Sequence, residues 1–151
     1  MAIPSSIELQ IVTPERMLVH EQVDEVEIPG ADGYFGVLPG HTPLLAALSV
    51  GELWYRKGQE KTYLSIAYGF AEVLPERVTI LAQLAERAED IDVERAEAAR
   101  SRASERLGQK SEVDYERARM ALMKSMTRLQ VSSRIASGAG PRLKRVRREG
   151  S

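Results

Sequence analysis

Few side chains in this chain could carry out catalysis. Its 151 residues include two histidines and no cysteine, which excludes histidine-rich and thiolate metal sites. The sequence also lacks a G-x-S-x-G nucleophile elbow and a G-x-x-x-x-G-K-[ST] phosphate loop. We therefore do not expect a free-standing enzyme. His41 stands in a turn between two prolines, where we expect its imidazole to hydrogen-bond loop backbone or to lie at an interface.

The charged residues divide the chain into two unlike halves. Residues 1–94 hold 6 Lys/Arg against 16 Asp/Glu, whereas residues 95–151 hold 15 Lys/Arg against 6 Asp/Glu. An acidic front and a basic back indicate two modules with different partners. The basic half carries no interleaved aromatics, so an acidic protein surface or a nucleotide phosphate fits it as well as nucleic acid does.

The front module shows the pattern of short strands and tight turns. Ile7, Leu9 and Ile11 alternate with polar residues, as in a strand with one buried face. Two hairpins are expected, one turning at residues 56–59 and one around residues 75–76. Turn signals every eight to twelve residues or so favour a sandwich or barrel. We therefore expect an α+β chain that begins with an antiparallel β-sandwich of about ten short strands over residues 1–87.

The back module shows the pattern of two helices over residues 88–135. Residues 91–107 contain no Gly or Pro, Asp92 can cap the helix start, and Gly108 is placed for a left-handed helix end. Residues 111–114 resemble a second capping box, and so short a connection makes the two helices antiparallel. The facing stripes hold mainly small residues, namely Ala96, Ala99, Ala103 and Leu107 on the first helix and Ala118, Leu122, Ser125 and Leu129 on the second.

Small-residue stripes bury little apolar area, at about 0.8 kcal/mol per methyl group. The helical hairpin should therefore be marginally stable alone and movable. Residues 136–151 begin with Gly- and Pro-containing sequence and then carry five basic side chains against one acid, which predicts a disordered basic tail. No run of about 18 apolar residues occurs, so we expect no membrane crossing.

The most specific pattern is GADGYFGVLPGHTPLLAALSVGEL, from residue 30 to residue 53. Its turns suit a scaffold and not a catalytic site. It resembles the epsilon subunit of bacterial F-type ATP synthases, in which G-x-x-G-x-x-G-[VI]-x-P-G-H-x-P-L-L is followed by a short loop and a G-x-[LI] strand start. The matching positions are Gly30, Gly33, Gly36, Val37, Pro39, Gly40, His41, Pro43, Leu44, Leu45, Gly51 and Leu53.

The resemblance covers about residues 5–135 and implies a non-catalytic rotor subunit of the central stalk. In that family the sandwich seats on the gamma subunit and the c-subunit ring, and the hairpin folds on the sandwich or extends toward the catalytic head, where it blocks ATP hydrolysis. An acidic segment of the beta subunit would attract the basic hairpin. The implied location is the cytoplasmic side of the bacterial plasma membrane, held through the complex alone. The ring-contacting loop falls on Ala31, Asp32, Gly33 and Tyr34, and the gamma contact on His41 and Thr42.

A further resemblance concerns ATP. Residues 91–96 match the [IL]-D-x-x-R-A segment that binds ATP in some bacterial epsilon subunits. The positions carried over are Glu86, Ile91, Asp92, Arg95, Ala96, Arg102, Lys124 and Arg128. Cations facing inward would repel one another, and a polyphosphate would relieve that repulsion through charge-assisted hydrogen bonds. We expect no required cofactor, with ATP as a candidate regulatory ligand. The alternative is that Asp92 is only an N-cap and Arg95 only a helix-surface residue.

Two other classes stay open from the residues alone. A stand-alone binder of nucleic acid or of an acidic protein, acting through the basic half, predicts association that weakens steeply with salt. A nucleotide sensor outside any synthase predicts no rotor partner. The epsilon-type interpretation instead predicts co-purification with gamma in a defined ratio.

Overall fold

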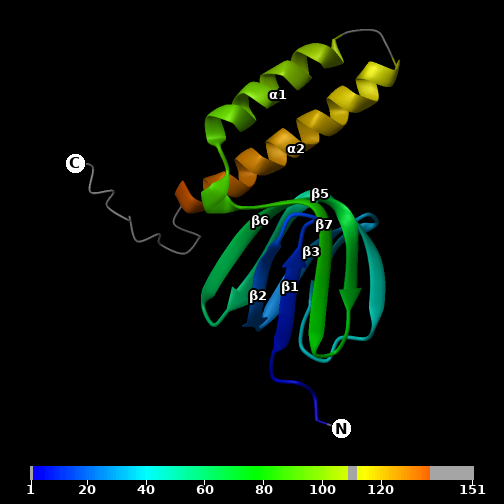
Figure 1. Cartoon of the computed structure of the whole chain (residues 1–151), viewed down its shortest axis with the longest axis vertical. Coiled ribbons are helices and arrows are strands. Elements are labelled where there is room, and N and C mark those ends of the chain that lie inside the picture. The colour runs from blue at the N-terminus through cyan, green and yellow to red at the C-terminus, as the bar shows by residue number, and fades with distance from the viewer. Residues whose placement is uncertain (1, 109–111, 137–151) are drawn as a thin grey trace, which may run out of the picture.

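The computed structural model describes residues 2–108 and 112–136 (Figure 1). Within them a strand-rich front is followed by a pair of helices. The elements are β1 (Ile7–Val12), β2 (Met17–Val23), β3 (Glu25–Gly30), β4 (Gly33–Val37), β5 (Leu44–Lys57), β6 (Glu60–Val73), β7 (Arg77–Arg87), the 3-10 helix η1 (Ala88–Asp90), α1 (Val93–Leu107) and α2 (Glu112–Ala136).

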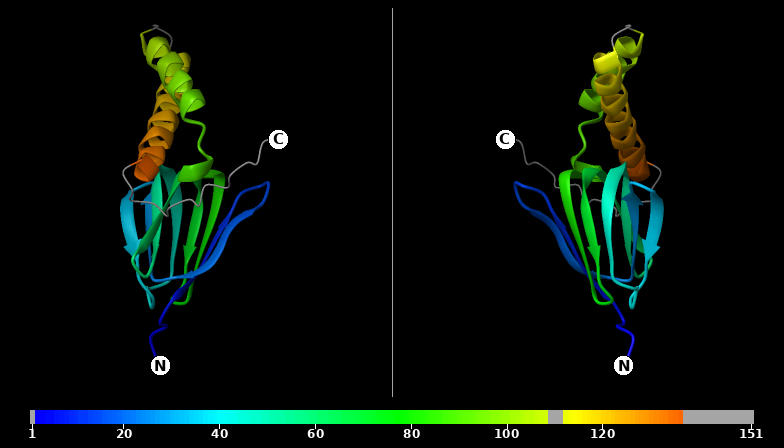
Figure 2. Two further views of the ribbon diagram at one scale, coloured as in Figure 1. Left: turned by 90° about the vertical axis from the view of Figure 1, so that its left-hand side faces the viewer. Right: turned by 90° about the vertical axis from the view of Figure 1, so that its right-hand side faces the viewer.

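The strands form one hydrogen-bonded sheet in the order β2-β1-β7-β6-β5-β3-β4. The sheet curls over on itself so that its strands surround a common core as a sandwich, and the β1–β2 hairpin splays away from the body (Figure 2). The core is made of aliphatic side chains on the inner faces. Its largest fully buried members include Ile7, Leu9, Ile11, Ile28, Leu53, Leu64, Ile66 and Ile80.

The expected hairpins are confirmed, but the expected strand count and uniform antiparallel pairing are not. Lys57 pairs with Glu60 and Val73 with Val78, which places the turns as predicted. The described residues form seven strands where we expected about ten. In addition, β1 and β7 run parallel. They are distant in sequence, so local patterns carry no information about the direction of that pair.

The strand count falls because β5 and β6 each run for 14 residues through positions that the sequence marks as breaks. Gly51 lies inside β5 and does not start a strand. In β6, Tyr68 and Gly69 have φ of 61° and 126°, and this bend shifts the side-chain alternation without ending the strand. Buried residues accordingly fall on Leu64 and Ile66 before the bend and on Ala71 and Val73 after it.

The helices follow the sequence prediction except at one end. Asp92 caps α1, its side chain accepting a hydrogen bond from the Arg95 backbone N–H at 3.0 Å. Gly108 is right-handed, with φ of −76°, so the predicted left-handed helix end is wrong. A final turn closed by the Gly108 N–H on the Glu105 carbonyl at 3.1 Å takes its place. The predicted second capping box begins at residue 111, which lies outside the described residues. Residues 137–151 of the predicted basic tail also lie outside them.

The hairpin docks on the sandwich mainly through the C-terminal part of α2, while the other ends of both helices stand away from it (Figures 1 and 2). The small-residue stripes do face each other, with Ala96, Ala103, Ala118 and Ser125 buried. At the docked end a second apolar cluster, separate from the sandwich core, joins the two modules. It consists of Tyr63, Ala88, Ile91 and Val131, with Trp54 and Ile135 packed against it. Neither described helix combines the length and the apolar character needed to cross a membrane.

Candidate functional site

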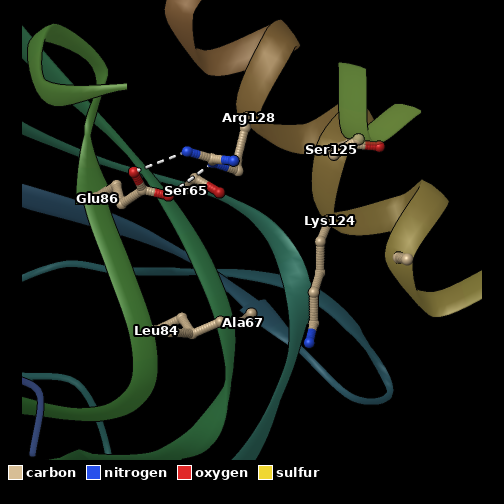
Figure 3. Close-up of a pocket in the computed structure, with 9 residues that line it drawn as sticks. Ser65, Ala67, Leu84, Glu86, Lys124, Ser125 and Arg128 are labelled. Atoms are coloured by element: carbon tan, nitrogen blue, oxygen red, sulfur yellow. Dashed lines mark hydrogen bonds and ion pairs between the residues drawn. The ribbon is translucent and has the colours of Figure 1, made fainter. Parts of the chain in front are cut away.

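A pocket of about 250 Å³ lies between the hairpin and the sheet (Figure 3). Strands β6 and β7 form one wall and the two helices form the other. Apolar and small side chains line most of it, with three charged groups among them. The lining residues are Ser65, Ala67, Leu84, Glu86, Ala99, Ala121, Lys124, Ser125 and Arg128.

An ion pair closes one side of this pocket. Arg128 reaches from α2 to Glu86 on β7, where its Nη2 donates to Oε2 at 3.2 Å (Figure 3). The buried Nε lies 2.7 Å from Oε1 but is not aligned to donate a hydrogen bond to it. Both side chains are only partly exposed, so solvent screens this pair less than a surface pair. The contact joins the two modules and leaves one guanidinium N–H without an aligned acceptor.

Lys124 supplies a second cation, one turn earlier on α2. Its side chain extends from the helix toward the strand side of the pocket (Figure 3). The ammonium lies 5.4 Å from the centre of the Tyr68 ring, within the range of a cation–π contact. Tyr68 could not be predicted from the sequence, because only its positive φ, which no local pattern indicates, marks it as unusual.

The structure brings three of the eight predicted ATP residues into the pocket, namely Glu86, Lys124 and Arg128. Ile91 and Ala96 are buried in packing, the former in the second apolar cluster. Asp92 is exposed and serves as the N-cap of α1. Arg95 and Arg102 are exposed on α1 and do not line the pocket.

The loop predicted to contact the ring, Ala31–Tyr34, lies against the start of β5. The Ala31 N–H donates to the Ala47 carbonyl at 2.8 Å, and the loop borders a surface hollow of about 390 Å³ together with residues 44–47. Tyr34 is 57% exposed, yet its hydroxyl accepts a hydrogen bond from the Glu52 backbone N–H at 3.1 Å. The loop is therefore anchored to the middle of β5.

His41 makes the predicted backbone hydrogen bond. Its Nδ1 donates to the Thr42 carbonyl at 2.6 Å. The neighbouring Gly40, with φ of 86°, donates its N–H to the Pro75 carbonyl at 2.8 Å. The first bond lies within the turn at residues 39–43, and the second holds that turn against the β6–β7 turn.

Exposed apolar side chains gather on the outer surface of the sandwich, a feature that the sequence analysis did not single out. Phe70 pairs across the sheet with Leu81 and Ala47, so these three form a row over β6, β7 and β5. Leu45, two residues before Ala47 on β5, lies on the same face beside the loop at residues 31–34. The large exposed members are Leu45, Phe70 and Leu81, at 53–71% exposure. We call Leu45, Ala47, Phe70 and Leu81 the apolar strip.

Metal-ligating side chains do not cluster in groups of three or more within the described part of the chain. The pocket residues instead offer two cations and one carboxylate on mostly apolar walls. That arrangement suits an anionic ligand with an apolar portion better than it suits bond-making chemistry.

Comparison with known proteins identifies the family. A family model described as the beta-sandwich domain of the ATP synthase delta/epsilon chain matches residues 6–88. The model of the long alpha-helix domain of the same chain matches residues 89–133.

The chain is similar to the ATP synthase epsilon chain of Syntrophobacter fumaroxidans, with 51% identity over 129 residues, which is 85% of this chain and 96% of that one. It is 48% identical over 127 residues to that of Nitratidesulfovibrio vulgaris strain DP4, covering 83% of this chain and 95% of the relative.

Solved structures agree with these relatives. A chain in the Euglena gracilis mitochondrial ATP synthase, solved by cryo-electron microscopy as OSCP/F1/c-ring in rotational state 1, gives a TM-score of 0.77 at 26% identity, covering 91% of this chain and 84% of that one. A chain of the Tetrahymena thermophila central stalk/c-ring gives 0.54 at 12% identity, covering 89% and 98%, and so supports the fold alone. From these matches, which span residues 6–133, the chain belongs to the ATP synthase delta/epsilon family.

Proposed function

We propose that this chain is a non-catalytic epsilon-type subunit of the central stalk of an F-type ATP synthase. The sandwich would join gamma to the c-subunit ring. The hairpin would regulate ATP hydrolysis by undocking from the sandwich or by remaining docked on it. The observation that carries the regulatory part is the pocket between hairpin and sheet, where Glu86, Lys124 and Arg128 converge. A ligand that fills it touches both modules and therefore favours the docked state.

The sandwich offers two surfaces for rotor partners. The apolar strip is suited to a protein partner, because exposed contiguous apolar area usually marks an interface. The adjoining loop Ala31–Tyr34 would meet the ring, and the turn that carries His41 and Thr42 would meet gamma. Such contacts would hold the chain at the cytoplasmic side of the membrane through its partners. The basic hairpin would meet an acidic segment of the beta subunit when it extends.

ATP would bind the docked hairpin through its phosphates. A phosphate oxygen could accept from the buried Arg128 Nε, which has no aligned acceptor, and compete with Glu86 for the rest of the guanidinium. The volume of about 250 Å³ lies below the roughly 300–1,000 Å³ of ordinary ligand pockets. Part of the nucleotide would therefore remain outside it, on the side where α1 carries Arg95 and Arg102.

The energetic effect follows from mass action. A ligand that binds only the docked state stabilises it by about 2.7 kcal/mol at a hundredfold excess over its dissociation constant. Small-residue stripes and an attachment at one end make the two states close enough in energy for that amount to matter.

The test is an ATP titration of the purified chain by calorimetry. We expect the unchanged chain to give saturable binding heat and the Arg128→Ala variant to give none. The Arg119→Ala variant is the control and should still bind, since Arg119 is an exposed arginine on the same helix outside the pocket lining. An Arg95→Ala, Arg128→Ala double variant tests whether α1 takes part. Absence of binding heat at about 1 mM ATP, or an equal loss of binding heat in the Arg128→Ala and Arg119→Ala variants, would remove ATP from the proposal. The chain would then be a rotor subunit whose hairpin responds to a different ligand or partner.

A further inference from the structure

Two adjacent residues in the middle of β5, Gly51 and Glu52, contact both the loop Ala31–Tyr34 and the end of α2. The loop side uses the backbone of this pair and the hairpin side uses the Glu52 carboxylate. These two contacts lie far apart in the chain. Because both contacts are made at the same point of β5, this point connects the loop Ala31–Tyr34 with the docked end of the hairpin. The proposed function gives these two surfaces separate roles.

On the loop side, Tyr34 fixes the backbone of β5. The β3–β5 ladder shifts register between Glu27 and Gly30, and beside this irregularity the Glu52 N–H donates to the Tyr34 hydroxyl at 3.1 Å. The ring end lies directly over Gly51. A Cβ at residue 51 would overlap the Tyr34 hydroxyl and come within 2.7 Å of the Pro29 Cβ, so the close approach requires glycine there.

On the hairpin side, the Glu52 carboxylate holds the last turn of α2. Arg134 donates from Nε to Oε2 at 3.0 Å and from Nη2 to Oε1 at 2.9 Å, a two-point arrangement that is strict in geometry. The Glu52 side chain is 9% exposed in this state. The guanidinium also lies 5.1 Å from the centre of the Tyr63 ring, within the second apolar cluster.

Burial makes this contact sensitive to small displacements. A carboxylate covered by the hairpin depends on its partner, because an unpaired buried charge is strongly unfavourable. Two parallel donor–acceptor bonds both weaken when the backbone that carries one partner shifts or rotates. The hydrogen bonds that Arg134 donates to Glu52 raise the pKa of Arg134 above its usual value, so the guanidinium stays charged.

We propose that residues 51 and 52 couple the loop Ala31–Tyr34 to hairpin docking. A partner that moves the Tyr34 ring off Gly51 shifts the Glu52 backbone, weakens the pair with Arg134 and favours undocking of α2. By reciprocity, undocking of α2 loosens the loop by the same factor. The coupling is a property of the isolated chain and needs neither a nucleotide nor a rotor partner, so it stands or falls independently of ATP binding.

The test is a double-mutant cycle read by hydrogen exchange of the full chain without nucleotide. The measured quantity is the protection of backbone amides at residues 128–135. The amides of β1 and β7, measured in the same sample, are the internal reference for sandwich stability. The cycle uses Tyr34→Phe, Arg134→Gln and the double variant. Tyr115→Phe, which removes a hydroxyl from another exposed tyrosine, is the matched control.

We expect Tyr34→Phe to lower protection of residues 128–135 about fivefold, and Arg134→Gln to lower it by a larger factor. In the Arg134→Gln background, Tyr34→Phe should have less than about a twofold effect, because the pair through which it acts is gone. Gly51→Ala, which displaces the ring but keeps the hydroxyl, should act in the same direction as Tyr34→Phe. Protection in β1 and β7 should stay within about twofold in every variant.

Three results would overturn the proposal. The first is an equal fold-change from Tyr34→Phe with and without Arg134, which means that the sites act independently. The second is an effect of Tyr34→Phe no larger than that of Tyr115→Phe. The third is a loss of protection in β1 and β7 in step with α2, which means that Tyr34 stabilises the whole sandwich.

Discussion

The sandwich and the hairpin are each stabilised by a different kind of contact. The sandwich buries large aliphatic side chains such as Leu9, Leu64 and Ile80 completely. The hairpin buries mainly alanine and serine between its helices and meets the sandwich at one end, through one small apolar cluster and two ion pairs. Apolar area thus stabilises the first module well beyond the second. A stable sandwich with a weakly attached hairpin is what the proposed regulation requires.

The largest effect should come from the sandwich core. Ile80→Ala removes a fully buried side chain and should lower the free energy of unfolding by about 2–5 kcal/mol. Urea denaturation measures it. Leu81→Ala, the next residue on β7, is the control, because that side chain is 53% exposed and should change stability by less than about 0.5 kcal/mol. Equal losses at the two positions would contradict the assigned core.

The next-largest effect should be a weaker docking of the hairpin, with no change in the stability of the sandwich. Val131→Ala removes two buried methyl groups from the second apolar cluster and should weaken docking by about 1–2 kcal/mol. Hydrogen exchange in α2 should rise several-fold while the sandwich transition in urea stays unchanged. Met126→Ala, at a 54% exposed position of the same helix, should leave both unchanged. A fall in sandwich stability that matched the loss of docking would mean that the modules unfold as one unit.

One substitution should move the two modules in opposite directions. Tyr68 holds a φ of 61°, which asparagine adopts at less cost than tyrosine. Tyr68→Asn should therefore stabilise the sandwich by about 0.5 kcal/mol and weaken docking by a similar amount, since the ring that faces Lys124 is lost. Urea denaturation and α2 hydrogen exchange on the same sample separate the two effects. A change of the same sign in both would contradict this account.

The smallest effect is a pH dependence confined to the sandwich. A hydrogen bond with His20, followed by one with Arg77, holds the pKa of Glu8 below its ordinary value of 4.5. A depressed pKa means that the folded state favours the carboxylate. Its stabilisation is therefore present above about pH 4.5 and is lost as the pH falls through the folded-state pKa. Glu8→Gln should flatten the decline of sandwich stability with acid, whereas Glu15→Gln, at an exposed position, should not.

Sequence patterns were informative where the structure depends on near neighbours. The two β-hairpin turns, the Asp92 cap and the facing small-residue stripes depend on residues within a few positions of one another, and all are confirmed. The resemblance implied a strand start at Gly51, but Gly51 lies inside β5, and Gly69 likewise lies inside β6. In the folded chain each marks a close approach within a continuous strand, to Tyr34 and to the Leu81 carbonyl respectively.

Long-range features could not be predicted in the same way. The parallel pairing of β1 with β7 and the Glu52–Arg134 pair join segments roughly 70–80 residues apart, and both depend on how the modules pack. The resemblance placed Glu86, Lys124 and Arg128 in one site, and the structure brings these three together. It leaves Arg95 and Arg102 exposed on α1, because the helix rotation that buries Ala96 and Ala103 turns them outward.

The central claim is that the hairpin can leave an intact sandwich, and a distance measurement tests it most directly. The chain has no cysteine, so Ser101→Cys on α1 and Gln83→Cys on β7, both exposed, accept spin labels without competing thiols. We predict one main distance between the labels in the otherwise unchanged chain. A longer, broader population should grow when Val131→Ala and Arg134→Gln are added, while the sandwich transition in urea is retained. A single unchanged distance in that variant, or loss of the sandwich transition together with the distance change, would contradict the account.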